Sequence, residues 1–185
     1  MRGSLFALFG LTQVGKQMGV EAQELPRSEN MHSPFMQKAI ELAVENVKTG
    51  KGGPFGAVVV RNGRIVATGT NTVTALNDPT AHAEIVAIRQ SCSRLDSFHL
   101  DDCELYTSCE PCPMCLGAIY WARCARVYYG ATRADAARAG FDDSLIYEQL
   151  DLPIKQRSLK MTQIMPVQAV APFDAWARKP DKTPY

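Results

Sequence analysis

The 185-residue sequence predicts an α/β fold, a three-layer αβα sandwich built around a central mixed sheet of five strands. Helical and β-branched segments alternate along the chain, which is the pattern of a sheet with helices on both faces. Two β-branched segments flank a tight turn and predict an antiparallel hairpin. Between residues 105 and 129 a strand, a helix and another strand follow in turn, and this order favours a parallel crossover. A hairpin and a crossover in one sheet make the sheet mixed.

A helix and the hairpin come first. Residues 33–50 predict an amphipathic helix, because a Ser-Pro pair supplies an N-cap and a first-turn proline, apolar residues recur at helical spacing, and a glycine ends the pattern. Residues 55–60 and 65–68 are rich in apolar and β-branched side chains, which predicts two strands. The Asn62-Gly63 dipeptide between them is typical of a two-residue hairpin turn.

Two more helices alternate with two more strands. Residues 81–92 follow an Asp-Pro pair, residues 111–122 begin with a proline, and both segments have helical periodicity. Strands are predicted at residues 105–107 and 127–129. Beyond Gly130 the signals weaken, and the remaining predictions are short helices at residues 134–139, 143–150 and 173–178 and a fifth strand at residues 161–167.

Composition and charge narrow the classes of partner. With 46% hydrophobic residues and a formal net charge of +1, the chain suits one globular domain, which we expect over residues 33–185. The balanced charge offers no clustered Lys and Arg for a phosphate backbone, so we expect no nucleic-acid partner. The apolar run 5–11 is too short to span a bilayer, and we expect no membrane partner. Residues 12–30 are polar and poorly periodic, so residues 1–32 are predicted to be a flexible N-terminal extension.

Cysteine usage indicates the redox compartment. The six cysteines lie between Cys92 and Cys124 rather than along the whole chain. Such crowding is unlike a disulfide framework, and three of the six belong to the motif region described next. We therefore expect reduced thiols and a cytoplasmic location.

Two motifs carry the chemistry: His82-Ala83-Glu84 and Pro111-Cys112-Pro113-Met114-Cys115. Imidazole and thiolate are ligands that zinc prefers, and we expect His82, Cys112 and Cys115 to hold one Zn²⁺. Three protein ligands leave the fourth tetrahedral position for water, which is typical of a catalytic site. Both motifs lie at predicted helix starts, where the positive end of the helix dipole favours thiolate.

Glu84 is the candidate proton carrier. A zinc-activated water would attack a ring carbon that bears an amino group, and Glu84 would protonate the adjacent ring nitrogen and then the departing amine. Residues i and i+2 point apart in an ideal helix. This geometry therefore requires His82 to reach beyond the helix end while Glu84 points along the pocket.

A structural zinc site is the alternative from a different class. Cys109 lies three residues before Cys112, and as a fourth ligand it would close the coordination sphere and exclude water. The protein would then be a zinc-stabilised interaction module rather than an enzyme. Against this interpretation, Cys109 falls at a predicted strand end, where a free cysteine is commonly a small buried residue.

From about Pro34 to Tyr185 the chain resembles the bacterial guanine deaminases of the cytidine-deaminase-like superfamily. The resemblance depends on the blocks Gly52–Ala57, Asn77–Glu84, Ser108–Trp121 and Gly140–Asp143. It implies a cytidine deaminase-like fold and a zinc-dependent deaminase domain over residues 33–185. It also implies hydrolysis of guanine to xanthine and ammonia, with zinc on the His and two Cys residues above and Glu84 as proton shuttle.

The resemblance further implies which residues contact the purine. Phe55 would pack on the ring, Asn71 would hydrogen-bond the purine edge, and Ala83 would be a further substrate-binding residue. Asp143 would meet the substrate amino group, and Tyr185 would cap the site in a domain-swapped homodimer whose C-terminal segments close each other's pockets. Aromatic character on the predicted helix 111–122 adds one further candidate, Trp121, as a pocket wall.

Other substrates remain open. A tRNA adenosine deaminase shares both zinc motifs and flips its target base into the pocket. Such an enzyme needs a basic surface, whereas the last forty or so residues of this chain mix acids and bases. Guanosine and aminotriazines could use the same catalytic groups, and no spacing in the chain ranks them.

Overall fold

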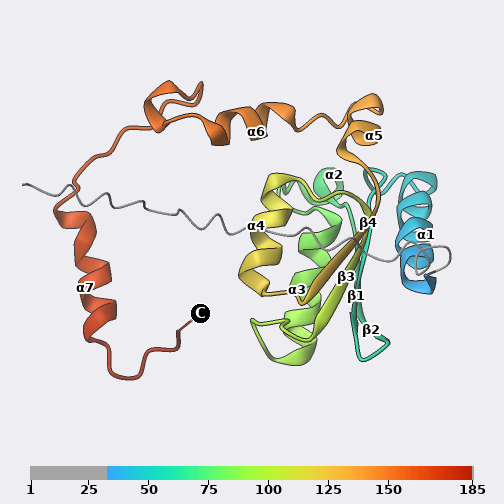
Figure 1. Ribbon diagram of the computed structural model, residues 1–185, viewed down its shortest axis with the longest axis horizontal. Helices are drawn as coiled ribbons and strands as arrows, with labels where there is room; N and C mark the ends of the chain where they lie inside the picture. The colour runs from blue at the N-terminus through green and yellow to red at the C-terminus, as the bar shows by residue number, and fades with distance from the viewer. Residues whose placement is uncertain (1–32, 185) are drawn as a thin grey trace, which may run out of the picture. The chain divides into compact units, whose positions relative to one another are not determined.

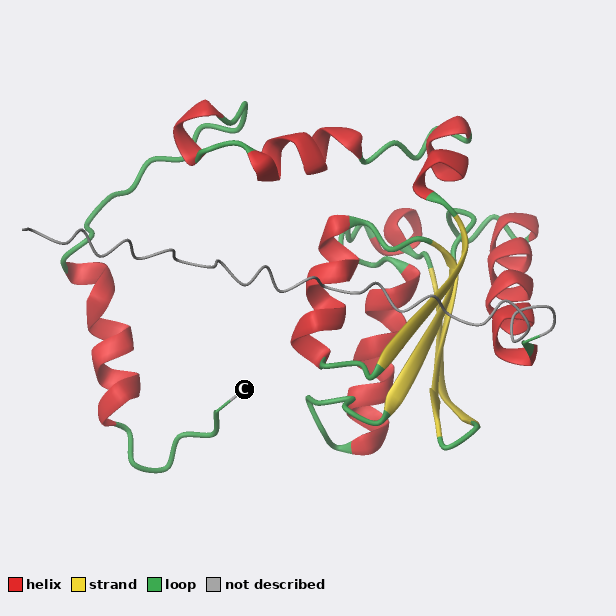
Figure 2. Cartoon of the chain, viewed as in Figure 1, coloured by secondary structure: helices red, strands yellow, loops and turns green. Residues whose placement is uncertain are grey.

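The computed structural model describes residues 33–184. At the centre of this region lies a four-stranded mixed sheet in the order β2-β1-β3-β4, with α1 on one face and α3 and α4 on the other (Figure 1; Figure 2). The α/β class and the mixed sheet are confirmed. The predicted N-terminal extension, residues 1–32, and the predicted site residue Tyr185 lie outside the described residues.

The sheet consists of the expected hairpin and crossover. Strands β1 (Gly56–Arg61) and β2 (Arg64–Thr70) pair antiparallel, and both residues of the Asn-Gly turn between them have positive φ angles, 51° and 70°. Strand β3 (Cys103–Cys109) pairs antiparallel with β1 and parallel with β4 (Arg126–Ala131). Strand β3, like β1, is therefore hydrogen-bonded to a strand on each side, and it leads directly into the second motif.

The prediction of a fifth strand is wrong for the described chain. Residues 161–167 contain no strand, and Ile164 and Val167 are 74% and 81% exposed. A strand needs a neighbour that accepts and donates its backbone hydrogen bonds, and no described strand runs beside this segment. An apolar, β-branched run shows a preference for extended backbone but cannot show whether a partner is present.

The helices largely follow the predictions, with boundaries shifted by a few residues. The side chain of Ser33 accepts a hydrogen bond from the Met36 amide and caps the first helix as expected. The predicted helices are α1 (Pro34–Lys48), α3 (Ala83–Leu95), α4 (Pro113–Ala122), α5 (Arg133–Arg138), α6 (Ser144–Asp151) and α7 (Ala171–Arg178). Three short elements were not predicted: α2 (Val73–Leu76) and the 3-10 turns Ile154–Gln156 and Gln168–Val170.

Alternation along the strands produces a core on each face of the sheet. In β1, Ala57 and Val59 belong to the cluster under α3 and α4, whereas Val58 and Val60 belong to the cluster under α1. All four are buried. The period of two in strand side chains therefore explains why this run is apolar without interruption.

A glycine brings the start of α3 against the sheet. A Cβ at Gly69 in β2 would lie 2.1 Å from the Ala83 carbonyl oxygen, which no real side chain tolerates. Only glycine permits this contact between strand and helix. Ala83 lies between His82 and Glu84 of the first motif. Gly69 therefore determines how closely this motif approaches the sheet.

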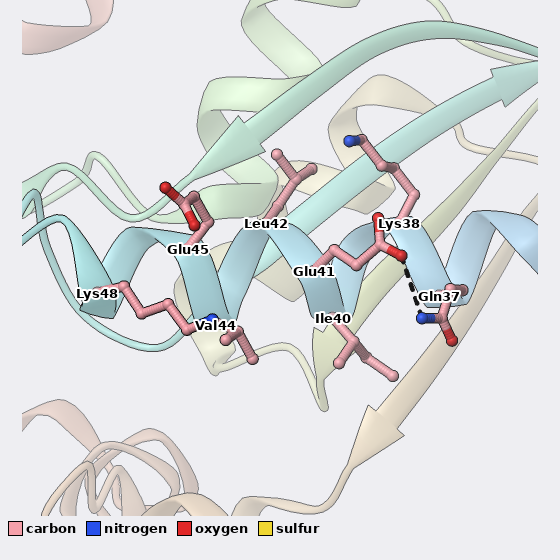
Figure 3. Close-up of a pocket in the computed structure, with 8 residues that line it drawn as sticks. All are labelled: Gln37, Lys38, Ile40, Glu41, Leu42, Val44, Glu45 and Lys48. Carbon is pink, nitrogen blue, oxygen red and sulfur yellow. Dashed lines mark hydrogen bonds between the residues drawn. The ribbon is translucent and has the colours of Figure 1, made fainter.

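The outward face of α1 has a shallow depression of about 440 Å³ (Figure 3). Apolar residues such as Ile40 and Val44 alternate there with charged ones, and Gln37 donates to Glu41 across one turn. Its lining contains no histidine or cysteine. This surface therefore offers no imidazole or thiolate ligand of the kind that the motifs provide for zinc.

The segment 131–184 differs from the rest of the described chain. None of its residues is buried, although it contains helices α5, α6 and α7. No helix between residues 33 and 184 combines the length and apolar character needed to cross a membrane.

Candidate active site

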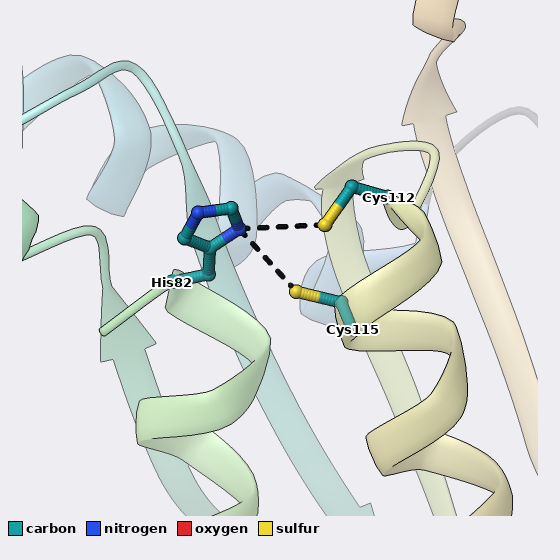
Figure 4. A group of neighbouring side chains, drawn as sticks. All are labelled: His82, Cys112 and Cys115. Carbon is teal, nitrogen blue, oxygen red and sulfur yellow. Dashed lines mark hydrogen bonds between the residues drawn. The ribbon is translucent and has the colours of Figure 1, made fainter. Parts of the chain in front are cut away.

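The three predicted zinc ligands lie together. His82 Nδ1 is 3.5 Å from the sulfur of Cys112 and 3.5 Å from the sulfur of Cys115. All three ligand atoms lie within 4.8 Å of one another. Figure 4 shows His82, at the start of α3, facing the two cysteines at the start of α4.

Helix ends explain how two distant motifs meet. His82 is the N-cap of α3 and Cys112 the N-cap of α4, each with extended backbone (φ −69°, ψ 157° and φ −66°, ψ 167°). An N-cap residue lies outside the helical turn, so its side chain is not bound to the i, i+2 directions of the helix. His82 therefore reaches off the helix end, as the proposed geometry requires. Cys115 follows within the first turn of α4 and is fully buried.

This donor set fits a zinc ion. Tetrahedral zinc with bonds of about 2.0–2.3 Å places its ligand atoms roughly 3.6 Å apart. A hydrogen bond from Cys115, with a further contribution from His82, lowers the pKa of Cys112 to about 4, so that one thiolate is present at neutral pH. The pKa of Cys115 is raised by that hydrogen bond and by burial, and a bound metal ion would remove this second proton.

Glu84 lies next to the metal ligands in the first turn of α3. It is 5% exposed, and burial raises the pKa of its carboxyl. One carboxylate oxygen accepts from the Cys115 thiol at 3.5 Å, and the other accepts from the Thr107 hydroxyl at 3.2 Å. A buried carboxyl with a raised pKa is suited to taking up and releasing protons near neutral pH.

Cys109 does not join the zinc ligands. Its thiol donates to the Thr132 carbonyl at 3.6 Å, and burial raises the pKa of Cys109 to about 11. Among the His, Cys, Asp and Glu side chains of residues 33–184, the metal-binding group has three members and does not include Cys109. The interpretation of a closed structural zinc site is therefore not supported.

A cavity of about 280 Å³ opens beside this group. Small-molecule sites commonly occupy about 300–1,000 Å³, so the cavity suits a small ligand. It is lined by Phe55, Asn71, His82, Glu84, Cys109, Glu110, Cys112, Arg133, Ala136, Gly140, Phe141, Asp142, Asp143 and Ile146. Two of the three metal ligands, Glu84 and three of the predicted substrate contacts thus share one cavity.

The predicted substrate residues are placed as follows. Phe55, Asn71 and Asp143 line the cavity. Ala83 is fully buried between His82 and Glu84 and is not part of the lining. Trp121 is 70% exposed on α4 and does not line the described cavity.

The Asn71 amide has a defined orientation. Its Oδ1 accepts hydrogen bonds from the backbone amides of Gly53 (3.4 Å) and Val73 (3.3 Å). The amide NH₂ group is therefore the end that remains for a ligand, since an Asn side chain has one carbonyl oxygen and one donor group.

Some contributors were not assigned from the sequence. Phe141 packs edge-on against Phe55, with ring centroids 5.0 Å apart, and Arg133 lies 4.7 Å over the Tyr147 ring at the cavity rim. Thr107 contacts Glu84 directly. Phe141 belongs to the Gly140–Asp143 block of the sequence, but its ring contact with Phe55 joins segments that are distant in the chain.

Asn46, at the far end of α1, was also missed. It is 3% exposed, and its side-chain amide donates to the carbonyls of Gly53 and Asn71, both at 2.8 Å. A polar residue on the inner face of an amphipathic helix was the signal that could have identified it. Asn46 thereby fixes the backbone just before Phe55, at Gly53, and the backbone at Asn71, whose amide donates to the Phe55 carbonyl.

Comparisons with known proteins agree with this geometry. Residues 29–131, more than half of the chain, match the family described as the cytidine and deoxycytidylate deaminase zinc-binding region. The guanine deaminase of Bacillus subtilis (strain 168) is 54% identical over 154 residues, which cover 83% of this chain and 99% of that protein. Its X-ray structure matches with a TM-score of 0.81 over 84% of this chain and 99% of that one.

A second class of relative matches a shorter part of the chain. The tRNA-specific adenosine deaminase of Agrobacterium fabrum is 50% identical over 78 residues, or 42% of this chain and 51% of that protein. The shared part is thus about half of that enzyme, whereas the B. subtilis match extends over nearly the whole relative. The chain therefore belongs to the zinc-binding family of cytidine and deoxycytidylate deaminases, together with the guanine deaminase of Bacillus subtilis.

Proposed function

We propose that this protein is a zinc-dependent guanine deaminase, which hydrolyses guanine to xanthine and ammonia. The observation that carries this conclusion is the cavity lined by His82, Cys112, Glu84 and Asp143, with Cys115 completing the metal-binding group behind its wall. The similarity to a guanine deaminase, which covers 83% of this chain and 99% of that protein, supports the same substrate.

The reaction requires that protons move between water, ring and leaving group. Zinc bound by the two cysteines and His82 supplies a Lewis acid that makes a water molecule nucleophilic at neutral pH. Glu84 takes the proton that the attacking water loses and delivers it to the ring nitrogen beside the amino-bearing carbon. Glu84 then takes the remaining proton from the hydroxyl that was added to the ring carbon and passes it to the amino group, which leaves as ammonia while the carbonyl forms, so one buried carboxyl serves as base and acid in turn.

Substrate recognition follows from the polarity of the lining. Guanine presents acceptors at N7 and O6, which suit the outward NH₂ group of Asn71. Its N1–H and amino group are donors, for which the Asp143 carboxylate is the natural acceptor. Phe55, held edge-on by Phe141, provides an apolar surface for the ring.

The turn before α6 supports a ligand role for Asp143. Asp143 occupies the N-cap position, yet its side chain makes no capping hydrogen bond. The preceding Asp142 accepts from the Ser144 amide at 2.9 Å instead. The Asp143 side chain is therefore not used to cap α6, and Asp143 lines the cavity.

The substrate is tested by an ammonia-release screen with the full chain. Free guanine is expected to give ammonia and an equimolar amount of xanthine, with slower or no release from guanosine, cytosine and aminotriazines. A tRNA substrate at moderate salt is expected to be unchanged. Deamination of adenosine in tRNA without activity on guanine would contradict the proposal and favour the rival enzyme class.

We also propose a homodimer in which the C-terminal segments are exchanged. Large apolar side chains in the segment 131–184 are exposed, including Leu159 (73%), Ile164 (74%) and Phe173 (73%). Soluble proteins rarely leave so many apolar side chains uncovered, which marks an interaction surface. The second copy is the proposed partner, and Tyr185 of each chain would cap the pocket of the other.

Mixed dimers test the exchange. Tyr185→Ala is expected to lower guanine turnover, and Glu84→Gln to reduce it by about 10²–10⁴-fold. When the two variants are co-expressed, a mixed dimer holds one pocket with Glu84 from one chain and Tyr185 from the other, so activity should recover. Guanine turnover above that of either variant alone requires that the C-terminal segments be exchanged. Turnover no higher than that of the variants, in a preparation shown to contain the mixed dimer, would contradict the exchange. A monomer by light scattering would contradict the dimer itself.

The proposed compartment is the cytoplasm. All six cysteines, between Cys92 and Cys124, are free thiols, and zinc binding requires two of them reduced. The proposed deaminase domain spans residues 33–185.

A further inference from the structure

Thr107 places a hydroxyl in an apolar layer. It is 1% exposed on β3, and the residues that share its strand face, Cys103 and Leu105, belong to the core under α3 and α4. A valine would match the shape of this side chain without the polar atom. Burying a hydroxyl costs free energy unless it is hydrogen-bonded. Packing alone does not explain a hydroxyl at position 107, so its hydrogen-bond partner must be identified.

The partner of this hydroxyl is Glu84. Thr107 Oγ1 donates to Glu84 Oε1 at 3.2 Å, and both groups are buried. The other carboxylate oxygen accepts from the Cys115 thiol at 3.5 Å. Thr107 is thus a donor to Glu84 that is not itself one of the predicted zinc ligands, so its contact with Glu84 remains available when Cys115 binds the metal ion.

The strand makes Thr107 a fixed point. Its backbone pairs with Ala57 of β1 on one side and with Tyr129 of β4 on the other. A β-branched side chain is also restricted in its χ1 angle. Glu84, by contrast, has a long flexible side chain whose carboxylate needs an anchor to stay in one orientation.

We propose that Thr107 is a positioning residue for Glu84. Its hydroxyl holds one carboxylate oxygen and leaves the other directed to proton transfer in the cavity. This inference rests on the proposed deaminase function, in which Glu84 moves protons. Since Thr107 does not line the cavity, its loss should reduce turnover rather than guanine binding.

The test compares variants that differ by one hydroxyl. Thr107→Val is expected to lower kcat on the order of tenfold, with KM and zinc content within about twofold of wild type. Thr107→Ser, which keeps the donor, should recover most of the turnover. Ser91→Ala is the matched control, because Ser91 is fully buried on α3 and its hydroxyl has no partner among the described residues.

A double-mutant cycle separates positioning from packing. In a Glu84→Gln background, Thr107→Val should change the residual rate by less than about twofold, because the group to be positioned is absent. An equal loss in both backgrounds, or a Thr107→Val variant with wild-type kcat, would overturn the inference. If Thr107→Val does not fold, the Ser and Ala variants at position 107 repeat the one-hydroxyl comparison. Absence of guanine turnover in the wild type would instead refute the proposed function.

Discussion

Glu84→Gln is expected to lose guanine turnover by about 10²–10⁴-fold while it retains zinc. Glutamine has nearly the same volume, so the buried position next to Thr107 and Cys115 remains filled. The amide cannot accept the proton of the attacking water or return it to the ring and the amine. The measurement is xanthine formation by absorbance, with zinc per chain determined by atomic absorption.

An exposed glutamate provides the matched control for this substitution. Glu45 lies on the outward face of α1 and does not line the active-site cavity, so Glu45→Gln should leave turnover unchanged (Figure 3). Substantial turnover in Glu84→Gln would show that protons travel by another route. Loss of zinc in that variant would mean that Glu84 supports the metal site rather than the reaction.

Cys112→Ser is expected to abolish both zinc binding and activity. A serine hydroxyl stays protonated at neutral pH, whereas Cys112 has a pKa of about 4 and offers a thiolate. Zinc should fall from about one per chain to near zero in the variant. Since zinc binds the folded state, a chelator should lower the Tm of the wild type and leave the Tm of the variant unchanged.

Cys109→Ser tests whether Cys109, which also lines the cavity, is a zinc ligand. Cys109 lies on the cavity wall but donates to the Thr132 carbonyl, so its replacement should keep zinc and most of the turnover. Loss of zinc from Cys109→Ser would revive the closed, four-ligand site. Retention of zinc in Cys112→Ser would contradict the assignment of this ligand.

The metal site could be predicted because each of its ligands belongs to a short sequence motif at the start of a helix. His82 and Cys112 are each the N-cap of a helix, and both helix starts are marked in the sequence by an Asp-Pro or Pro signal. Zinc ligand chemistry then names the residue types that belong together. The hairpin was predictable for the same reason, since its Asn-Gly turn requires the positive φ angles that the structure has.

The rest of the site depends on contacts that no short segment contains. The hydrogen bond between Thr107 and Glu84 requires that β3 lie beneath the start of α3, and the Phe55–Phe141 contact joins segments more than eighty residues apart in the chain. The fifth strand was mistaken because residues 161–167 have a strand-like pattern without a neighbouring strand. Local preference determines how a segment can fold, while its partners determine whether it does.

The two hydrogen bonds of Asn46 make α1 relevant to ligand affinity. This helix has no residue in the cavity, yet its last turns tie down the carbonyls of Gly53 and Asn71. Replacing Asn46 by an apolar residue would remove the side-chain donor from both carbonyls, and the Gly53 carbonyl would keep the hydrogen bond from the Phe55 amide. Natural variants that change selectivity for the base need not, therefore, map to the cavity wall: a helix on the opposite face of the sheet can tune the same pocket through its backbone.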